Sequence, residues 1–224
     1  MFRLIPILYL TQLENISKQQ LMITDIDYKV YTDASLYDSP YDRHTYRYTP
    51  LLAYMMKWNS QVDWLGKVFL VLFDILSILG LWKLMKIQYR ESIVKLYAYN
   101  PLFIYLTVRG SCESINMCLM YWCFYFIFQH NGNSALHNKL NKYIQIKPLP
   151  TFSLLLGYFL YGLWVHFRIY PIIFLPALLV HQYHMSKKTS QSFLLNFIQL
   201  ALVSGAAFLT LFFIFFSLYG HQFI

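Results

Sequence analysis

Charged residues are scarce in this chain. Of its 224 residues, only 12% are Asp, Glu, Lys or Arg, whereas 58% are hydrophobic and 20% are aromatic. A soluble domain usually carries about twice that share of charge. The excess of eight basic over acidic residues would suit nucleic acid, but the polar surface that a nucleic-acid-binding protein needs is missing. The composition therefore predicts a membrane protein with basic loops on one side of the bilayer and no nucleic-acid partner.

Cysteine is also scarce, and its spacing argues against a zinc site. Cys112, Cys118 and Cys123 form no CxxC pair and lie in or beside an apolar run. Free buried thiols are the expected state for such residues.

The start of the chain, residues 1–10 (MFRLIPILYL), is apolar but short. It lacks the flanks of a signal peptide, and a membrane span needs about 20 apolar residues. We interpret residues 1–10 as the remnant of a first transmembrane helix.

Apolar blocks separated by polar breaks make up most of the chain. They predict about six transmembrane helices, at residues 67–82, 93–108, 115–129, 151–165, 169–183 and 193–219. The predicted fold class is all-α, a polytopic membrane bundle forming a single domain over 1–224, with 11–66 as a long first loop. Several blocks have fewer than 18 residues, so these helices must extend into their flanks or be shielded from lipid by protein.

Basic residues recur in alternate loops. The three basic groups are Lys83, Lys86, Arg90 and Lys95, then Lys139, Lys142 and Lys147, then Lys187 and Lys188. Basic loops face the cytosol, so the other loops face the opposite side. That second set comprises residues 11–66, the Arg109 turn, the turn at 166–168 and the C-terminal tail. Seven of the ten acidic residues lie between Glu14 and Asp63, in this non-cytosolic set.

The first long loop carries helix signals. Residues 28–37 contain no Pro or Gly, so they can form a helix with Asp25 or Asp27 as its N-cap. Pro40 disfavours helix at the residue before it. Thr49 and Pro50 then suit the N-cap and first position of a second helix. The loop also holds many tyrosines, which are typical of the membrane interface, and we expect it to lie on the bilayer.

Four stretches of sequence resemble a known family. They read TDIDYKVYTDA at 24–34, SPYDRHTYRYTPLLAY at 39–54, NPLFIYLTVRGSCESI at 100–115 and VHFRIYPIIFLP at 165–176. In this order they resemble the catalytic subunit of GPI mannosyltransferase I, which adds the first mannose to the glycosylphosphatidylinositol (GPI) anchor precursor. The four stretches are spread over residues 22–180.

The resemblance implies a GT-C glycosyltransferase fold in the endoplasmic reticulum membrane, with several membrane spans. Asp25 and Asp27 match the lumenal DxD motif of the family. Where the family usually reads Asn-Ala-Asp-Ser, this chain has Ser111, Cys112, Glu113 and Ser114, and Glu113 keeps a carboxylate on a longer side chain. Family members continue past the end of this sequence, so we expect the chain to be a fragment. A small accessory membrane subunit is the implied partner.

The implied reaction moves mannose from dolichyl phosphate mannose to glucosaminyl-phosphatidylinositol, forming an α-1,4 linkage with inversion. Asp25 or Asp27 would act as the general base on the acceptor hydroxyl. Cationic side chains would stabilise the phosphate leaving group. The expected substrate-binding residues are Arg43, Tyr46, Arg47, Arg109, Glu113, Asn116, His166, Arg168 and Tyr170. No cofactor is required, and a divalent metal is optional because the donor carries a single phosphate.

Simpler roles compete for several of these residues. Either aspartate of the DxD motif can be a plain helix cap, Arg109 and Arg168 can reach to the interface, and His166 can be structural. Asp74, within a predicted span, can be functional or can make a hydrogen bond between helices.

Other functions compete as well. An inactive, shortened protein that only binds partners or lipid would fit the short ends. Another glycosyltransferase using a dolichyl phosphate sugar, or a transporter, would fit the composition less well.

Overall fold

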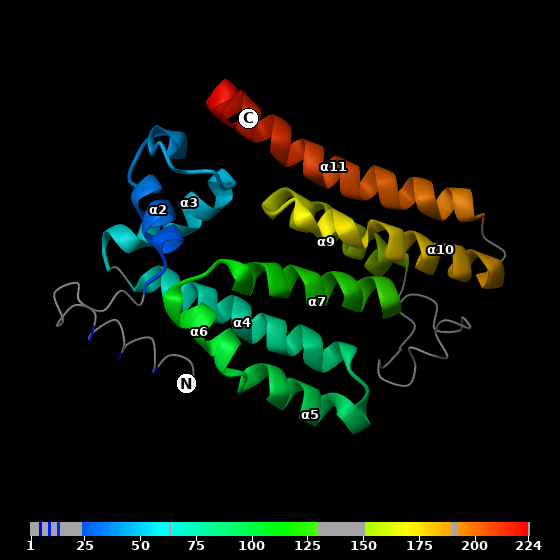
Figure 1. Ribbon diagram of the computed structural model, residues 1–224. Coiled ribbons are helices and arrows are strands. Elements are labelled where there is room, and N and C mark those ends of the chain that lie inside the picture. The colour runs from blue at the N-terminus through cyan, green and yellow to red at the C-terminus, as the bar shows by residue number, and fades with distance from the viewer. Residues whose placement is uncertain are drawn as a thin grey trace. The chain divides into compact units, whose positions relative to one another are not determined.

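The computed structural model describes residues 24–62, 64–129, 151–189 and 192–223, together with Ile5, Tyr9 and Leu13 (Figure 1). The elements in these ranges are helical, and no β-strand is found among them. They are α2 (Ile26–Ala34), η1 (Pro40–Asp42), α3 (Pro50–Met56), η2 (Lys57–Ser60), α4 (Leu65–Leu84), α5 (Ile87–Ala98), α6 (Pro101–Arg109), α7 (Glu113–Gln129), α9 (Thr151–Phe167), η3 (Tyr170–Phe174), α10 (Leu175–Thr189), α11 (Phe193–Tyr219) and η4 (Gly220–Phe223). The predicted all-α class is confirmed, whereas the helix predicted at 1–10 falls almost wholly outside the described residues.

Two helical segments are long and apolar enough to cross a membrane. They are Leu65–Leu84, with 20 residues, and Phe193–Phe223, with 31 residues. Both reach the roughly 20 residues that a bilayer requires. Together with the composition, they identify an all-α membrane protein, and the division into six spans stays a prediction.

The helix predicted at 93–108 is in fact two helices. α5 ends at Ala98 and α6 begins at Pro101. The Asn100 side chain accepts the N–H of Leu102 at 2.9 Å, which caps the new helix. Proline lacks an N–H and keeps the residue before it out of the α region, so the helix cannot pass through. The predicted helix at 169–183 is also two elements, the short η3 (Tyr170–Phe174) and α10 from Leu175.

The chain divides into two compact units. Unit 1 comprises Met1–Leu76, Leu96–Met117 and Phe215–Ile224, and unit 2 comprises Ser77–Lys95 and Cys118–Ile214. Within unit 1, α2 packs against α3, η1 and η2. Most of the predicted site residues belong to unit 1.

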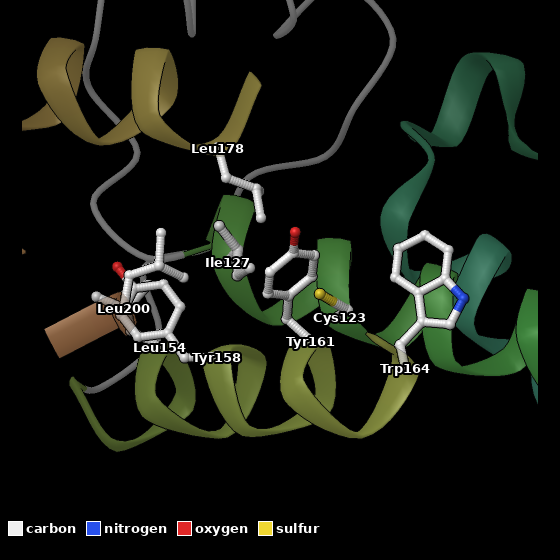
Figure 2. Packing of buried hydrophobic residues seen from close by; sticks show 8 residues of the cluster. All are labelled: Cys123, Ile127, Leu154, Tyr158, Tyr161, Trp164, Leu178 and Leu200. Carbon is white, nitrogen blue, oxygen red and sulfur yellow. The ribbon is translucent and has the colours of Figure 1, made fainter. Parts of the chain in front are cut away.

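A hydrophobic cluster forms the core of unit 2 (Figure 2). Its buried members are Cys123, Ile127, Leu154, Tyr158, Tyr161, Trp164, Leu178 and Leu200. The Trp164 ring stacks on Phe174 with 5.3 Å between centroids, which packs η3 against α9. Cys123 is buried here, and Cys112 and Cys118 are buried elsewhere. No disulfide joins them, so the prediction of buried thiols is confirmed.

Candidate functional site

Asp25 is the N-cap of α2. Its side-chain carboxylate accepts the N–H of Asp27 at 3.4 Å, and its backbone is extended. This geometry satisfies one of the N–H groups that the first turn of a helix leaves without a partner. Of the two caps that the sequence allowed, the structure selects Asp25, and Asp27 lies in the first turn.

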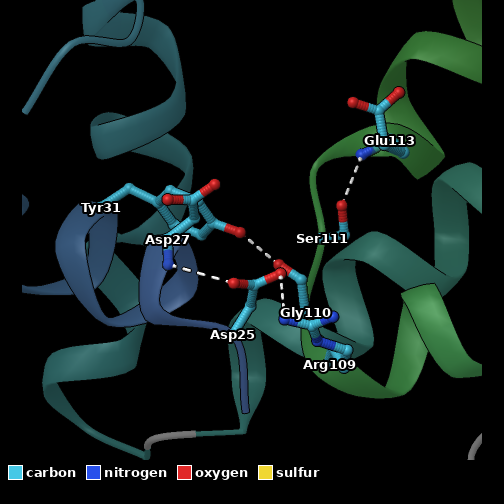
Figure 3. Close-up of polar contacts among 7 residues, drawn as sticks. All are labelled: Asp25, Asp27, Tyr31, Arg109, Gly110, Ser111 and Glu113. Atoms are coloured by element: carbon cyan, nitrogen blue, oxygen red, sulfur yellow. Dashed lines mark hydrogen bonds and ion pairs between the residues drawn. The ribbon is translucent and has the colours of Figure 1, made fainter.

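Asp25 is joined twice to Arg109, at the end of α6. Its backbone N–H donates to the Arg109 carbonyl at 2.9 Å. The Arg109 Nη2 lies 3.2 Å from the Asp25 Oδ2, and the guanidinium also covers the Tyr105 ring at 5.3 Å from its centroid. Figure 3 shows the Asp25 carboxylate between the start of α2 and this turn. The first and third of the four sequence motifs therefore meet here.

The two carboxylates of the DxD motif lie in different surroundings. The Asp25 side chain is 22% exposed and holds both the cap and the ion pair. Asp27 is exposed, and among the described residues its carboxylate makes no hydrogen bond or ion pair. Only Asp27 thus presents both carboxylate oxygens to a ligand.

The turn after Arg109 is shaped by Gly110. Its φ of 83° is left-handed, its N–H donates to the Thr107 carbonyl, and the Ser111 N–H donates to the Leu106 carbonyl. These bonds form the Schellman motif that commonly ends a helix at glycine. A Cβ at this position would overlap the Tyr28 ring.

Tyr31 ties α2 to the same turn. Its hydroxyl donates to the Gly110 carbonyl, and the residue is fully buried. Burial raises the pKa of the Tyr31 hydroxyl well above its usual value near 10. Tyr28 and Tyr31 together hold the start of α2 on the Arg109 turn.

Tyr46 is a core residue. It is fully buried, its hydroxyl donates to the Thr49 carbonyl at 2.6 Å, and it accepts the Ala53 N–H at 3.2 Å. Burial also raises the pKa of this hydroxyl. With no exposed surface, Tyr46 supports the start of α3, and the prediction that it touches substrate does not fit its position.

Arg43 and Arg47 lie in the segment between α2 and α3. Arg43 forms an ion pair with Asp33 of α2 at 3.4 Å. Arg47 is exposed and donates to the Tyr46 carbonyl at 2.9 Å. Both guanidinium groups therefore stay near the surface of unit 1.

Glu113 and Asn116 form a polar pair in the first turn of α7. The Asn116 Nδ2 donates to the Glu113 Oε2 at 3.2 Å, and the Glu113 N–H donates to the Ser111 Oγ at 3.4 Å. The Asn116 Oδ1 is buried and has no hydrogen-bond donor among the described residues. Asn116 is 1% exposed, so the predicted contact of its side chain with substrate would require this turn to open.

Asp74 is buried within α4 and accepts a hydrogen bond from the Thr107 hydroxyl of α6. The alternative of a hydrogen bond between helices is therefore confirmed for Asp74. This bond joins α4 to the helix that carries Arg109.

Two polar residues near α2 were missed by the sequence reasoning. Lys67 is 2% exposed, and its ammonium donates to the Thr24 hydroxyl at 2.8 Å. Asn59 is also 2% exposed and donates to the Tyr28 hydroxyl at 2.9 Å. For Lys67, the one available signal was a lysine at the start of a predicted apolar span. No such signal was available for Asn59.

His166, Arg168 and Tyr170 belong to unit 2. The His166 ring contacts Phe208 edge to face, with 5.6 Å between centroids, and the Arg168 N–H continues α9 by donating to the Trp164 carbonyl. Tyr170 is 46% exposed at the start of η3. The three residues follow one another through the turn between α9 and η3.

No described residues form a group of three or more acidic, His or Cys side chains that could hold a metal ion. Asp25 and Asp27, as a pair, supply carboxylate oxygens of the kind that divalent cations bind. Asp25 already gives its two oxygens to the cap and to Arg109.

The chain is similar in sequence to several curated GPI mannosyltransferases. It is 31% identical to GPI mannosyltransferase 1 of Saccharomyces cerevisiae and 34% identical to that of Dictyostelium discoideum, over 90% of this chain in each case. It is 32% identical, over 92% of this chain, to the Danio rerio GPI alpha-1,4-mannosyltransferase I, catalytic subunit. The chain spans about half the length of these relatives, 47%, 47% and 50%.

A family model described as GPI transamidase subunit PIG-U matches residues 30–224. No solved structure matches the chain. The resemblance drawn from the four motifs is confirmed by the names of the curated relatives. The chain therefore belongs to the family that the PIG-U model describes, and its curated relatives are the GPI mannosyltransferases that its motifs resemble.

Proposed function

We propose that this chain is the part of a GPI mannosyltransferase that carries the catalytic base. The reaction moves mannose from dolichyl phosphate mannose to glucosaminyl-phosphatidylinositol, forming an α-1,4 bond, at the lumenal face of the endoplasmic reticulum. The proposal is supported by the names of the relatives. The observation that carries it is the contrast between Asp25, held in a cap and an ion pair, and Asp27, exposed beside it.

Asp27 is the proposed general base. An acceptor hydroxyl is a poor nucleophile until its proton is removed, and a positioned carboxylate typically contributes about 10²–10⁴-fold to such a reaction. Asp27 lies at an exposed position, where an acceptor can reach its carboxylate. Asp25 orients the motif, because its oxygens accept the Asp27 N–H and pair with Arg109.

The leaving group is a lipid phosphate that gains negative charge as the sugar departs. Guanidinium groups stabilise such charge through paired, charge-assisted hydrogen bonds. Arg109, next to the DxD motif, is the proposed partner. Arg168 and His166, in the other unit, are an alternative suggested by the family resemblance alone. The buried Asn116 amide donates to Glu113 and would orient that carboxylate rather than bind the sugar itself.

An apolar cavity in unit 2 suits the isoprenoid tail of such a donor. It has a volume of about 350 Å³ and is lined by α9, η3, α10 and α11, including Val165, Ile169 and Phe208. Val165 and Ile169 flank the turn that contains His166 and Arg168. A phosphate held at that turn would thus have an apolar site close to it for its lipid.

Complementation tests the proposal. Cells lacking the first GPI mannosyltransferase would receive the full-length protein, and microsomes would be assayed for mannose transfer from dolichyl phosphate mannose. We expect Asp27→Asn to reduce transfer by at least about 100-fold. The matched control is Asp38→Asn, at an exposed position of the same loop, and it should retain activity. Full activity of Asp27→Asn at normal expression would contradict the base assignment.

A second candidate function follows from the family model, whose description names a GPI transamidase subunit. In that case the chain would bind the GPI lipid within an assembly and would transfer no mannose. Restored surface display of GPI-anchored proteins in cells lacking that subunit, without rescue of mannosyltransferase-deficient cells, would favour this function.

A further inference from the structure

Lys67 has a buried ammonium group next to the DxD motif. We propose that Lys67 is a positioning residue, which fixes the start of α2 and thereby the carboxylates of Asp25 and Asp27. The inference rests on the proposed mannosyltransferase function. It assigns a role in the reaction to a residue that the sequence presents only as the start of an apolar span.

The Lys67 ammonium contacts the chain on both sides of the motif. It donates to the Thr24 hydroxyl at 2.8 Å, and Thr24 directly precedes Asp25. The same ammonium lies 5.5 Å from the centroid of the Tyr28 ring, within the range of a cation–π interaction. Tyr28 directly follows Asp27, so one side chain of α4 holds both ends of the Asp25–Asp27 segment.

Asn59 reinforces this arrangement from the turn before α4. Its amide donates to the Tyr28 hydroxyl at 2.9 Å and to the Thr32 hydroxyl at 2.8 Å. The side-chain Oδ1 of Asn59 accepts the N–H of Gly66, the residue before Lys67. The start of α4 and the first two turns of α2 are therefore linked through two adjacent polar contacts.

The burial of Lys67 defines the kind of role it can have. At 2% exposed, its side chain lies beneath the motif, where substrate has no access. Taking an ammonium out of water is costly unless hydrogen bonds and charge compensate it, so its contacts with Thr24 and Tyr28 offset a real cost. Loss of the ammonium would move the carboxylates without removing any group that binds substrate.

A kinetic comparison of Lys67→Met with Lys57→Met tests this role in the full-length protein. Lys57 is exposed in the same unit. Displacement of a reacting group by about 1 Å can cost about 100-fold in rate. We therefore expect Lys67→Met to lower kcat at least about tenfold, with KM for dolichyl phosphate mannose changed by less than about threefold. Lys57→Met should match the unmodified protein. A change confined to KM, or an unchanged kcat, would overturn the inference.

Thr24→Val provides a second variant, since Lys67→Met can fail to accumulate. It removes the hydroxyl acceptor and keeps the size of the side chain. We expect a lower kcat in Thr24→Val, and a Thr24→Val/Lys67→Met double variant no slower than Lys67→Met alone, because residues in one contact are not additive. Additive losses would show that the two residues act separately.

Hydrogen exchange separates the inference from the proposed function. In Thr24→Val, the backbone amides of residues 26–31 should exchange at least about tenfold faster than in the unmodified protein, because α2 opens locally more often. If the unmodified protein transfers no mannose but exchange rises, the proposed function fails and the positioning of α2 stands. If the unmodified protein is active and exchange is unchanged in Thr24→Val, the positioning role is wrong.

Discussion

Asp25 and Arg109 are joined by a backbone hydrogen bond of 2.9 Å and by an ion pair of 3.2 Å. The two residues belong to different sequence motifs, so neither contact is local. The backbone bond holds the segment before α2 whatever side chain is present. The ion pair, by contrast, depends on both side chains, and substitutions can therefore separate the two contributions.

Asp25→Asn and Asp25→Ala should differ in stability. Asn caps a helix about as well as Asp, so Asp25→Asn loses the ion pair alone, worth at most about 1 kcal/mol at this exposure. Asp25→Ala also loses the cap and should cost about 1 kcal/mol more. Thermal unfolding in detergent measures both.

Arg109→Gln supplies the control for the ion pair. Combined with Asp25→Asn, it should cause little loss of stability beyond that of either single variant, because the partner is already neutral. A double variant with summed losses would show that Arg109 contributes through its contact with Tyr105 instead.

Gly110→Ala should destabilise unit 1 by at least about 2 kcal/mol, from the left-handed backbone and the overlap with the Tyr28 ring. The control is Gly205→Ala, where a Cβ meets no atom within 4 Å. Alanine in a helix interior is favoured over glycine by about 0.5–1 kcal/mol, so this variant should not lose stability. Unfolding temperatures of the two variants, measured side by side, test the contrast. Equal stability of Gly110→Ala and the unmodified protein would contradict the described turn.

Thr107→Val should weaken the packing of α4 against α6. It deletes the hydroxyl that donates to Asp74, and hydrogen bonds between membrane helices contribute about 0.6–1.7 kcal/mol. Thr210→Val, at an exposed position of α11, is the matched control and should be neutral. Proteolysis rates in detergent distinguish the two, and equal rates would argue that this hydrogen bond contributes nothing.

Alkaline pH should destabilise unit 1 through Tyr31. Its pKa is raised in the folded state by burial, whereas in the unfolded chain it returns to about 10. The contribution of Tyr31 to the free energy of unfolding is therefore complete below pH 10. It is lost as the pH rises above that value toward the pKa of the folded state. Unfolding temperature measured between pH 8 and about pH 11 should fall above pH 10.

The control for the alkaline effect is a pair of Phe substitutions. Tyr31→Phe cannot ionise and should make the decline shallower, with the remainder due to the buried Tyr46 hydroxyl, although it starts from a lower stability because the hydrogen bond to Gly110 is lost. Tyr37→Phe, at a position that is 51% exposed, should leave the decline unchanged. The assignment fails if both variants follow the unmodified protein.

Local signals in the sequence predicted local structure well. The cap at the DxD motif, the helix start at Pro50 and the three buried cysteines follow from a few neighbouring residues each. The break at Asn100 and Pro101 was equally local. It was missed because the apolar run around it suggested one continuous span, and the hydropathy of a run does not reveal a missing N–H.

Contacts between distant segments lay beyond the sequence. Lys67 meets Thr24 across 43 residues, and no periodicity encodes such a pairing. Tyr46 was expected at the surface because tyrosine suits membrane interfaces, but the fold uses its hydroxyl to satisfy backbone groups at the start of α3. The predicted distribution of loops between the two sides of the membrane stays a prediction.

The fit of the Tyr28 ring against Gly110 has a consequence for genetics. Part of the damage caused by a Cβ at position 110 comes from the ring alone. A second substitution, Tyr28→Ala, would remove that overlap, but it would also delete a buried side chain whose hydroxyl accepts from Asn59 and whose ring lies near the Lys67 ammonium, at a cost of about 3–5 kcal/mol. In a screen for revertants of Gly110→Ala, return to glycine should therefore prevail over changes at Tyr28, because each residue of this pair is required by the other.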